Sequence, residues 1–145
     1  MDFSLWLCTL GLCVRYASWN MRNLMTGKFE IKWLARPEEH DYPGAGSYLS
    51  LLYPAQTARA LVARLRRAQM GESKDIFRAS GLALLGEGNS HVNKDRKRIE
   101  AGQKLSPLLL VRDATHGKVL VADGYHRLCA VYSFDEDAVI PCKIV

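Results

Sequence analysis

A glycine turn separates an apolar run from an amphipathic one near the C-terminal end of this chain. The apolar run covers residues 119–122, the turn is Asp123-Gly124, and apolar side chains then recur at Leu128, Val131 and Tyr132. A short apolar run followed by spacing close to 3.6 residues predicts a strand that leads straight into a helix. This junction constrains the fold, because the strand needs neighbours in a sheet and the helix must bury its apolar face against that sheet.

The neighbouring segments supply the other strands of such a sheet. Residues 108–112 and 118–122 read as two strands joined by the five-residue loop 113–117, which suits a hairpin. The helix is expected over residues 124–134, with an acidic turn at 135–137 after it. A final strand follows, with Ile140, Cys142 and Ile144 on one face. The order strand, strand, helix, strand predicts an α+β fold with a small mixed sheet and packed helices.

The first half of the chain reads as one strand and several helices. Alternation over residues 29–34 predicts a half-buried strand, and residues 38–44 read as a polar loop. Helices are expected from Ser47 to residue 52, from Pro54 to a stop at Gly71, over residues 74–79, and from a cap at Asn89 or Ser90 to a stop at Gly102.

Composition places the chain among globular proteins with a core. Its 145 residues, 48% of them hydrophobic, suit one domain, and the formal net charge of +5 permits an anionic partner without requiring one. The four cysteines lack metal-ligand spacing, so we expect reduced thiols in a cytoplasmic protein. The apolar stretch of residues 3–14 is too short to span a bilayer, and no membrane association is expected. We interpret residues 1–24 as an extension and residues 25–145 as the domain.

The helix start after Gly124 is the candidate binding site. The first N–H groups of a helix lack internal partners and lie at the positive end of its dipole, so they attract a phosphate. Gly124 would allow close approach, Arg127 offers a charged contact, and His126 a donor that titrates near neutral pH. Asp123 is expected to cap the helix, or else to hold a metal or a substrate hydroxyl, and Tyr125 to form a wall of the pocket. The alternative is a plain hairpin turn with His126 and Arg127 exposed.

Three stretches of the C-terminal part resemble the ParB/sulfiredoxin-like domain family. They are the proline-led strand at 105–111, the strand-turn-helix segment at 121–130, and the closing strand at 140–145. The resemblance implies nucleotide binding, with phosphates at the start of the Gly124 helix and contacts from the positions of His126 and Arg127. Tyr125 stands where sulfiredoxins carry their nucleophilic cysteine, so sulfinic-acid reduction is not expected. Partition proteins of the family carry two arginines in this motif and a helix-turn-helix region beyond it, so DNA recognition of that kind is not favoured.

Carboxylates near the first strand supply the candidate catalytic groups. Members of the family that phosphorylate free serine need an acidic residue in this region, and Glu38, Glu39 and Asp41 are available. The expected ligand is a nucleoside di- or triphosphate. With a triphosphate, one of these carboxylates could act as general base toward a hydroxyl near the γ-phosphate, and Mg²⁺ would neutralise phosphate charge. A solvated loop is the alternative interpretation of this cluster.

Three functions therefore remain open. The first is nucleotide hydrolysis or phosphoryl transfer to a small hydroxyl substrate. The second is a non-catalytic module whose nucleotide occupancy controls a partner surface around residues 86–90. The third is a nuclease of the ParB-like type, whose basic clusters at 59–67 and 94–104 would follow a phosphate backbone.

Overall fold

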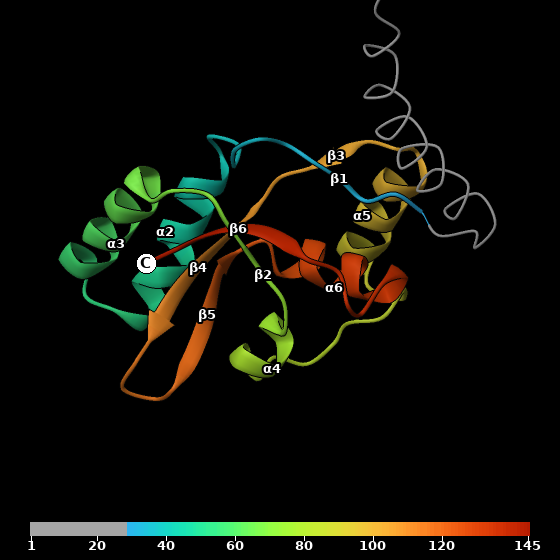
Figure 1. Ribbon diagram of the computed structural model, residues 1–145. Helices are drawn as coiled ribbons and strands as arrows, with labels where there is room; N and C mark the ends of the chain where they lie inside the picture. Colours follow the sequence, from blue (N-terminus) through green and yellow to red (C-terminus); the bar gives the residue numbers. More distant parts are fainter. Residues whose placement is uncertain (1–28) are drawn as a thin grey trace, which may run out of the picture. The chain divides into compact units, whose positions relative to one another are not determined.

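A four-stranded mixed sheet organises residues 29–145, the part of the chain that this computed structural model describes (Figure 1). Its strand order is β2-β6-β4-β5, with β2 at Gly71–Ser73, β4 at Leu108–Asp113, β5 at Lys118–Asp123 and β6 at Ile140–Ile144. The β4–β5 hairpin is antiparallel, whereas β6 returns beside β4 and runs parallel to it. The chain therefore crosses over from β5 to β6 through a helix, as the strand, strand, helix, strand prediction requires.

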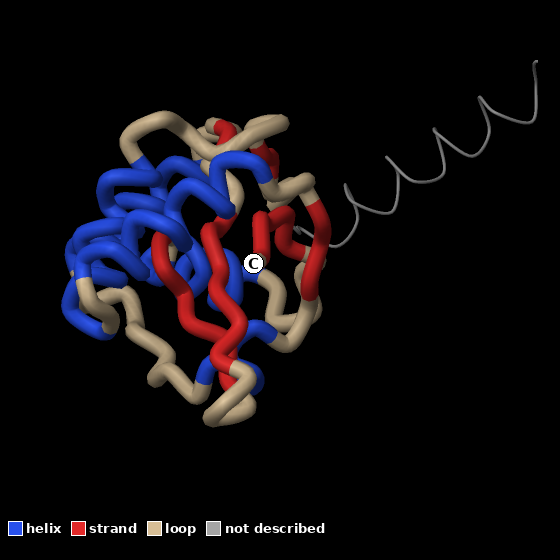
Figure 2. The backbone as a smooth tube through the Cα atoms, turned by 90° about the vertical axis from the view of Figure 1, so that its left-hand side faces the viewer, coloured by secondary structure: helices blue, strands red, loops and turns tan. Residues whose placement is uncertain are grey.

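Strand β4 is buried on both of its faces. Leu108 and Leu110 pack into one hydrophobic cluster, while Leu109 and Val111 pack into another. Because neighbouring side chains of a strand point to opposite faces, this division shows that helices cover both sides of the strand. Figures 1 and 2 show the helices on the two sides of the strands.

The two layers of helices come from different parts of the chain. The N-terminal layer contains α2 (Asp41–Leu52) and α3 (Ala55–Arg67), which contribute Leu49 and Leu65 to the core. The other layer contains α4 (Ile76–Ser80), α5 (Ser90–Glu100) and α6 (Tyr125–Phe134), which contribute Val92 and Leu128 among others. The α+β class and the order of the C-terminal elements are thus confirmed.

The N-terminal elements depart from the prediction. Instead of a strand over residues 29–34, the structure has a two-residue strand β1 (Lys32–Trp33), which pairs in parallel with β3 (Lys104–Leu105). The polar loop predicted over residues 38–44 is wrong in its second half, because α2 begins at Asp41. Pro43 is compatible with the first turn of a helix, where its missing N–H has no partner to lose. Ser47 consequently lies inside α2 rather than capping a helix.

The connection after α3 contains a strand that the sequence pattern did not predict. Helix α3 ends at Arg67, and Gly71 opens β2 instead of closing the helix. Strand β2 is short and polar and pairs at the sheet edge with β6, so it carries no apolar alternation. Its existence depends on tertiary pairing.

Residues Ile31–Val145 form one compact unit. Within the described part of the chain, no helix has the length and apolar character needed to cross a membrane. Cys129 and Cys142 are buried free thiols, and burial raises the pKa of each. The expected extension of residues 1–24 and the boundary at residue 25 lie outside the described residues.

Candidate functional site

Gly124 joins β5 to α6 in a left-handed conformation. Its φ is +99°, and it occupies the N-cap position of a helix that begins at Tyr125, so the N-cap residue has no side chain to accept from the first N–H groups. A Cβ atom on Gly124 would overlap the side chain of Leu108 and would lie 3.0 Å from a terminal nitrogen of Arg127. Glycine is therefore required here for two reasons. The backbone is left-handed, and the side chain of Leu108 of β4 occupies the space that a Cβ atom would need.

Arg127 is held by two carboxylates of the protein. Its guanidinium donates to Asp41 Oδ1 at 3.3 Å and to Asp123 Oδ2 at 2.5 Å. The Arg127 side chain is only 12% exposed, and that of Asp41 only 1%. The Nε atom of Arg127 is buried and has no hydrogen-bond partner among residues 29–145. The arginine that was expected to contact phosphate directly thus has both terminal nitrogens committed to protein partners.

Asp41 anchors this network from the start of α2. Its Oδ2 accepts hydrogen bonds from the Ser106 hydroxyl and from the Glu38 backbone N–H, the latter at 3.1 Å. An acidic side chain in the first turn that bonds back to a preceding N–H stabilises a helix start as a capping box does. This bond explains why α2 begins inside the predicted loop. Sequence reasoning missed Ser106, although a lone polar residue inside the apolar stretch 105–111 was a signal.

Asp123 is the titratable group whose pKa is most clearly displaced toward neutrality. Burial raises the pKa of this carboxyl to about 6, the nearby charge of Asp41 also raises it, and Arg127 opposes the shift. Burial has this effect because it disfavours the charged form. The predicted capping role is not seen, since α6 has no side-chain cap. Asp123 instead lies between Arg127 and Gly44 of α2, whose missing Cβ leaves room for the carboxylate.

The α6 start opens into a cleft of about 200 Å³. All five residues predicted for binding line it, namely Asp123, Gly124, Tyr125, His126 and Arg127, and α5 adds His91, Lys94, Asp95 and Arg98. Helix α5 was predicted with a cap at Asn89 or Ser90, and the side chain of Asn89 caps it by accepting from the N–H groups of His91 and Val92. Its contribution to the site could not be read from the sequence, because the contact of α5 with α6 is tertiary.

Two imidazoles stack inside this cleft. The ring centroids of His91 and His126 are 4.8 Å apart, with an interplanar angle of 32°. Burial lowers the pKa of His126, and the proximity of His91 lowers it further. His126 is therefore mainly neutral at pH 7, and its ring carries one N–H donor and one acceptor. The ring of Tyr125 lies beside His126, while its hydroxyl donates to the carbonyl of Ala83 at 2.5 Å.

The predicted catalytic carboxylates are not equivalent in the structure. Asp41 lies in the Arg127 network, whereas Glu39 is 83% exposed and pairs with Arg66 at 2.7 Å. Glu38 and His40 lie near Asp41, with His40 Nε2 at 3.7 Å from Glu38 Oε2 and 3.5 Å from Asp41 Oδ1. Of the three acids, Asp41 alone bonds to a residue of the cleft.

The donor set of Glu38, His40 and Asp41 does not fit resident Mg²⁺. The ligand atoms lie within 4.8 Å of one another. However, Mg²⁺ demands oxygen ligands in octahedral geometry, and one of the three donors here is an imidazole nitrogen. Asp41 also already accepts from Ser106, Glu38 and Arg127, so a dication there would face the guanidinium. Any Mg²⁺ would have to arrive with the phosphates it neutralises.

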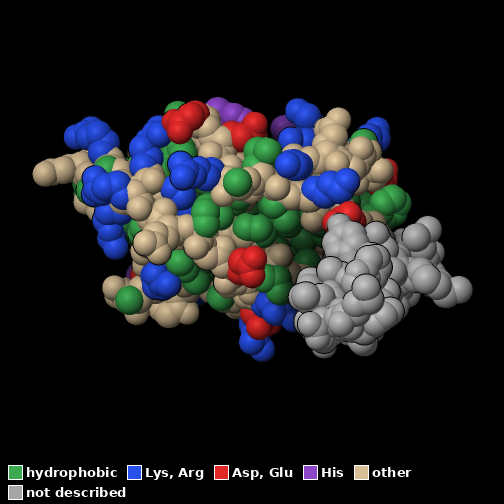
Figure 3. Space-filling view, turned by 45° about the horizontal axis from the view of Figure 1, so that its top comes forward, with side chains coloured by type: hydrophobic (Ala, Val, Ile, Leu, Met, Phe, Trp, Pro, Cys, Tyr) green, Lys and Arg blue, Asp and Glu red, His purple; other side chains and the backbone are tan. Residues whose placement is uncertain are grey.

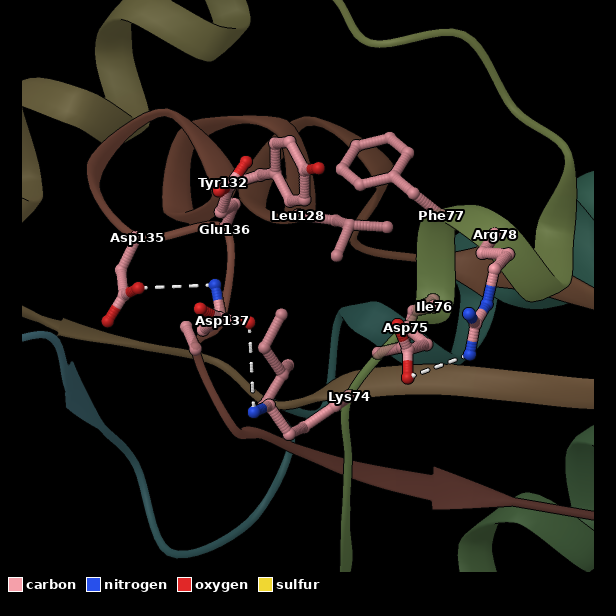
Figure 4. Close-up of a pocket in the computed structure, with 12 residues that line it drawn as sticks. Lys74, Asp75, Ile76, Phe77, Arg78, Leu128, Tyr132, Asp135, Glu136 and Asp137 are labelled. Carbon is pink, nitrogen blue, oxygen red and sulfur yellow. Dashed lines mark hydrogen bonds and ion pairs between the residues drawn. The ribbon is translucent and has the colours of Figure 1, made fainter.

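A second cavity, of about 170 Å³, lies between α4 and the C-terminal end of α6. Figure 4 shows Lys74 directed toward Asp137 and Arg78 toward Asp75, with the rings of Phe77 and Tyr132 nearby. The two rings meet edge to face at 5.0 Å. Because both basic side chains of the lining, Lys74 and Arg78, already pair with acidic ones, this cavity offers no unpaired cation to a phosphate.

Comparisons with protein-family models, with curated proteins and with solved structures found no match to this chain. The resemblance to the ParB/sulfiredoxin-like family therefore stays a prediction from the sequence motifs.

Proposed function

We propose that this chain binds the phosphates of a nucleoside di- or triphosphate in the cleft at the start of α6. The observation that carries the proposal is an uncapped helix N-terminus that opens into a cleft with basic walls. The lining contains three permanent cations, Lys94, Arg98 and Arg127, against two carboxylates, Asp95 and Asp123. Arg127 pairs with Asp41 and Asp123, and Arg98 lies 3.4 Å from Asp95, so an anion there would meet the N–H groups of the first helical turn and the ammonium of Lys94.

The phosphate ligands differ from those that the sequence motif suggested. Among the residues that the structure describes, Lys94 makes no ion pair, so its ammonium is available to an anion. His126 offers a ring N–H, and an anion would favour its protonated form. Arg127 acts as a positioning residue, because it fixes Asp41 and Asp123 beside the helix start.

The size of the cleft indicates which part of the ligand it takes. Its volume of about 200 Å³ is below the roughly 300–1,000 Å³ typical of pockets for whole small molecules. The phosphates would therefore occupy the cleft, and the nucleoside would lie at its rim near His91 and Tyr125.

A thermal-shift series tests this proposal. Pyrophosphate, ADP, ATP and CTP are added with and without Mg²⁺, and a ligand at 100 times its Kd should stabilise the native state by about 2.7 kcal/mol. Lys94→Ala and His126→Ala should lose most of that protection. Lys118→Ala is the matched control, because this exposed lysine begins β5 and Asp123 of the cleft ends it. The proposal fails if none of the compounds protects the protein, or if both cleft variants are protected as well as the control.

Turnover of the bound nucleotide is a second candidate function, and the raised pKa of Asp123 favours it. A general base works best with a pKa near the operating pH, and the pKa of Asp123 is raised to about 6. Asp123 would accept the proton of an attacking water or of a small hydroxyl substrate as its oxygen bonds to the terminal phosphorus. The bond between that phosphorus and the bridging oxygen would break, and the nucleotide shortened by one phosphate would leave.

Phosphate release across pH 5–8 distinguishes turnover from binding alone. Turnover should rise with pH around an apparent pKa near 6 and should be lost in Asp123→Asn while nucleotide binding remains. Thermal protection without any phosphate release would favour the non-catalytic binding module instead.

A further inference from the structure

We infer that the exposed face of α5 extends this cleft into a track for the phosphodiester backbone of a single-stranded nucleic acid. The track rests on the proposed function for the seat of a terminal phosphate, but it adds three cations that do not line the cleft, Lys32, Lys97 and Lys104. It would make the ligand of the site a chain of phosphates rather than an isolated nucleotide.

An open groove along α5 forms the central part of the track. The groove has a volume of about 510 Å³ and shares two of its lining residues, Lys94 and Arg98, with the cleft. The full lining comprises three cations, three uncharged polar residues and no carboxylate: Lys94, Lys97, Arg98, Ser90, Asn93 and Gln103. Cations set among hydroxyl and amide groups, without competing acids, suit phosphate and sugar oxygens.

The spacing of these residues on α5 explains the continuity of the groove. Lys94, Lys97 and Arg98 are three and four positions apart, which places them on one side of the helix. The opposite side buries Val92 and Ile99 in the core. Helix α5 has 11 residues and is therefore about 16 Å long, enough for more than one phosphate of a chain.

Two further lysines continue the track beyond α5. Arg98 donates to the backbone carbonyl of Lys104 at 3.3 Å, which joins the helix to β3. Lys104 pairs in register with Lys32 of β1. A Cβ atom built on Gly102 would lie 3.8 Å from the Lys32 ammonium. Since Gly102 follows α5, Lys32 lies beside the C-terminal end of that helix. The cationic strip therefore comprises Lys32, Lys94, Lys97, Arg98 and Lys104.

The charges of the strip are largely uncompensated. Arg98 is 3.4 Å from Asp95, but none of the four lysines of the strip makes an ion pair with another residue of the described part of the chain. By contrast, Arg96 on the flank of α5 pairs with Glu87 at 2.8 Å and covers the ring of Phe134. Figure 3 shows Lys and Arg side chains gathered in separate areas of one face, with hydrophobic surface between them.

The junction of groove and cleft favours a single strand over a duplex. His91 is exposed, and its ring lies against that of His126 where α5 meets the start of α6. Ring faces of this kind bind unstacked bases, which single strands present and duplexes keep paired. The small cleft beyond them suits one terminal phosphate group.

Fluorescence anisotropy with a 5′-phosphorylated 12-residue DNA strand, and with the RNA of the same sequence, tests the track. For single strands, the slope of log K against log salt concentration is about −0.7 for each phosphate that is neutralised. Contacts from all five cations of the strip should give a slope of about −3.5 in total. Lys97→Ala should bind more weakly and reduce the magnitude of the slope by about 0.7. Lys118→Ala is the matched control, because this exposed lysine at the start of β5 lies outside the strip and outside both basic clusters of the sequence.

The outcomes separate the track from the phosphate site. If nucleotides protect the protein but Lys97→Ala and Lys118→Ala bind the strand alike, the track is wrong and the proposed function stands. If the strand binds through Lys97 but neither nucleotides nor removal of the 5′-phosphate has an effect, the proposed function is wrong and the track stands. Equal or tighter binding of a blunt duplex, or of inorganic polyphosphate, would overturn the assignment to single-stranded nucleic acid. An unchanged Tm for Lys97→Ala establishes that this variant is folded.

Discussion

Replacing Gly124 by alanine should destabilise the domain through two separate costs. The backbone at this position has φ +99°, and a left-handed conformation costs an ordinary residue about 1–2 kcal/mol. The added methyl group would also overlap the Leu108 side chain, which is fully buried, and overpacking a core costs about 1–3 kcal/mol. We expect a total loss of about 2–5 kcal/mol in the free energy of unfolding.

Gly117 supplies the matched control for the first cost. It also has a positive φ, +61°, but a Cβ there would have no neighbour within 4 Å. Gly117→Ala should therefore cost only about 1–2 kcal/mol. For a unit of this size, 1 kcal/mol corresponds to a change of about 4 °C in Tm, so the expected losses are about 8–20 °C for Gly124→Ala and about 4–8 °C for Gly117→Ala. Thermal unfolding followed by circular dichroism measures both, and equal losses would refute the steric argument.

A double-mutant cycle isolates the overlap between Gly124→Ala and Leu108. Leu108→Ala alone should cost about 2–5 kcal/mol, as for other buried leucines. In a protein that already carries Gly124→Ala, the substitution Leu108→Ala also removes the overlap. Its cost in the free energy of unfolding should therefore be smaller by about 1–3 kcal/mol. Additive losses would mean that Leu108 does not restrict position 124.

Three further changes test the surrounding network. Asp41→Ala should cost about 3–5 kcal/mol, measured as a lower urea midpoint at constant m-value, because it leaves the buried Arg127 cation with one carboxylate fewer. The pKa of Asp123 is about 6 in the folded state against an ordinary 3.8, so the native state binds more protons between these values. Stability should therefore fall by up to about 3 kcal/mol as the pH rises from 4 to 6.5. Asp123→Asn should remove that part of the pH dependence, and identical profiles for the two proteins would contradict the raised pKa. Asn89→Ala should cost about 1 kcal/mol through loss of the α5 cap, and an unchanged denaturation midpoint would show that this cap contributes nothing.

The C-terminal elements could be predicted because their signals are local. The apolar runs of β4 and β5, the glycine between β5 and α6, and the spacing of Leu128 and Val131 each act within a few residues. The N-terminal half was harder to predict because β1 and β2 are two and three residues long and exist through pairing with β3 and β6. The start of α2 at Asp41 depends partly on Ser106, which is 65 positions away.

The candidate site could likewise be predicted only in part. The residues of the helix start line the cleft as the motif predicted, because a strand-turn-helix junction brings them together by itself. The motif could not reveal that Arg127 is occupied by Asp41 and Asp123, since a sequence pattern shows which side chain carries charge but not which partner neutralises it. The contribution of Lys94 likewise depends on the packing of α5 against α6.

The Asp41–Arg127 ion pair also has a consequence for the order of folding. Its partners are separated by 86 positions, so the pair closes a loop that contains most of the domain. Loop-closure entropy delays such contacts until the intervening chain has collapsed, and the arrangement of the helix start should be among the last features to form. A ligand that binds this arrangement should then slow global unfolding as well as raise the midpoint, because releasing Arg127 from Asp41 separates α6 from α2.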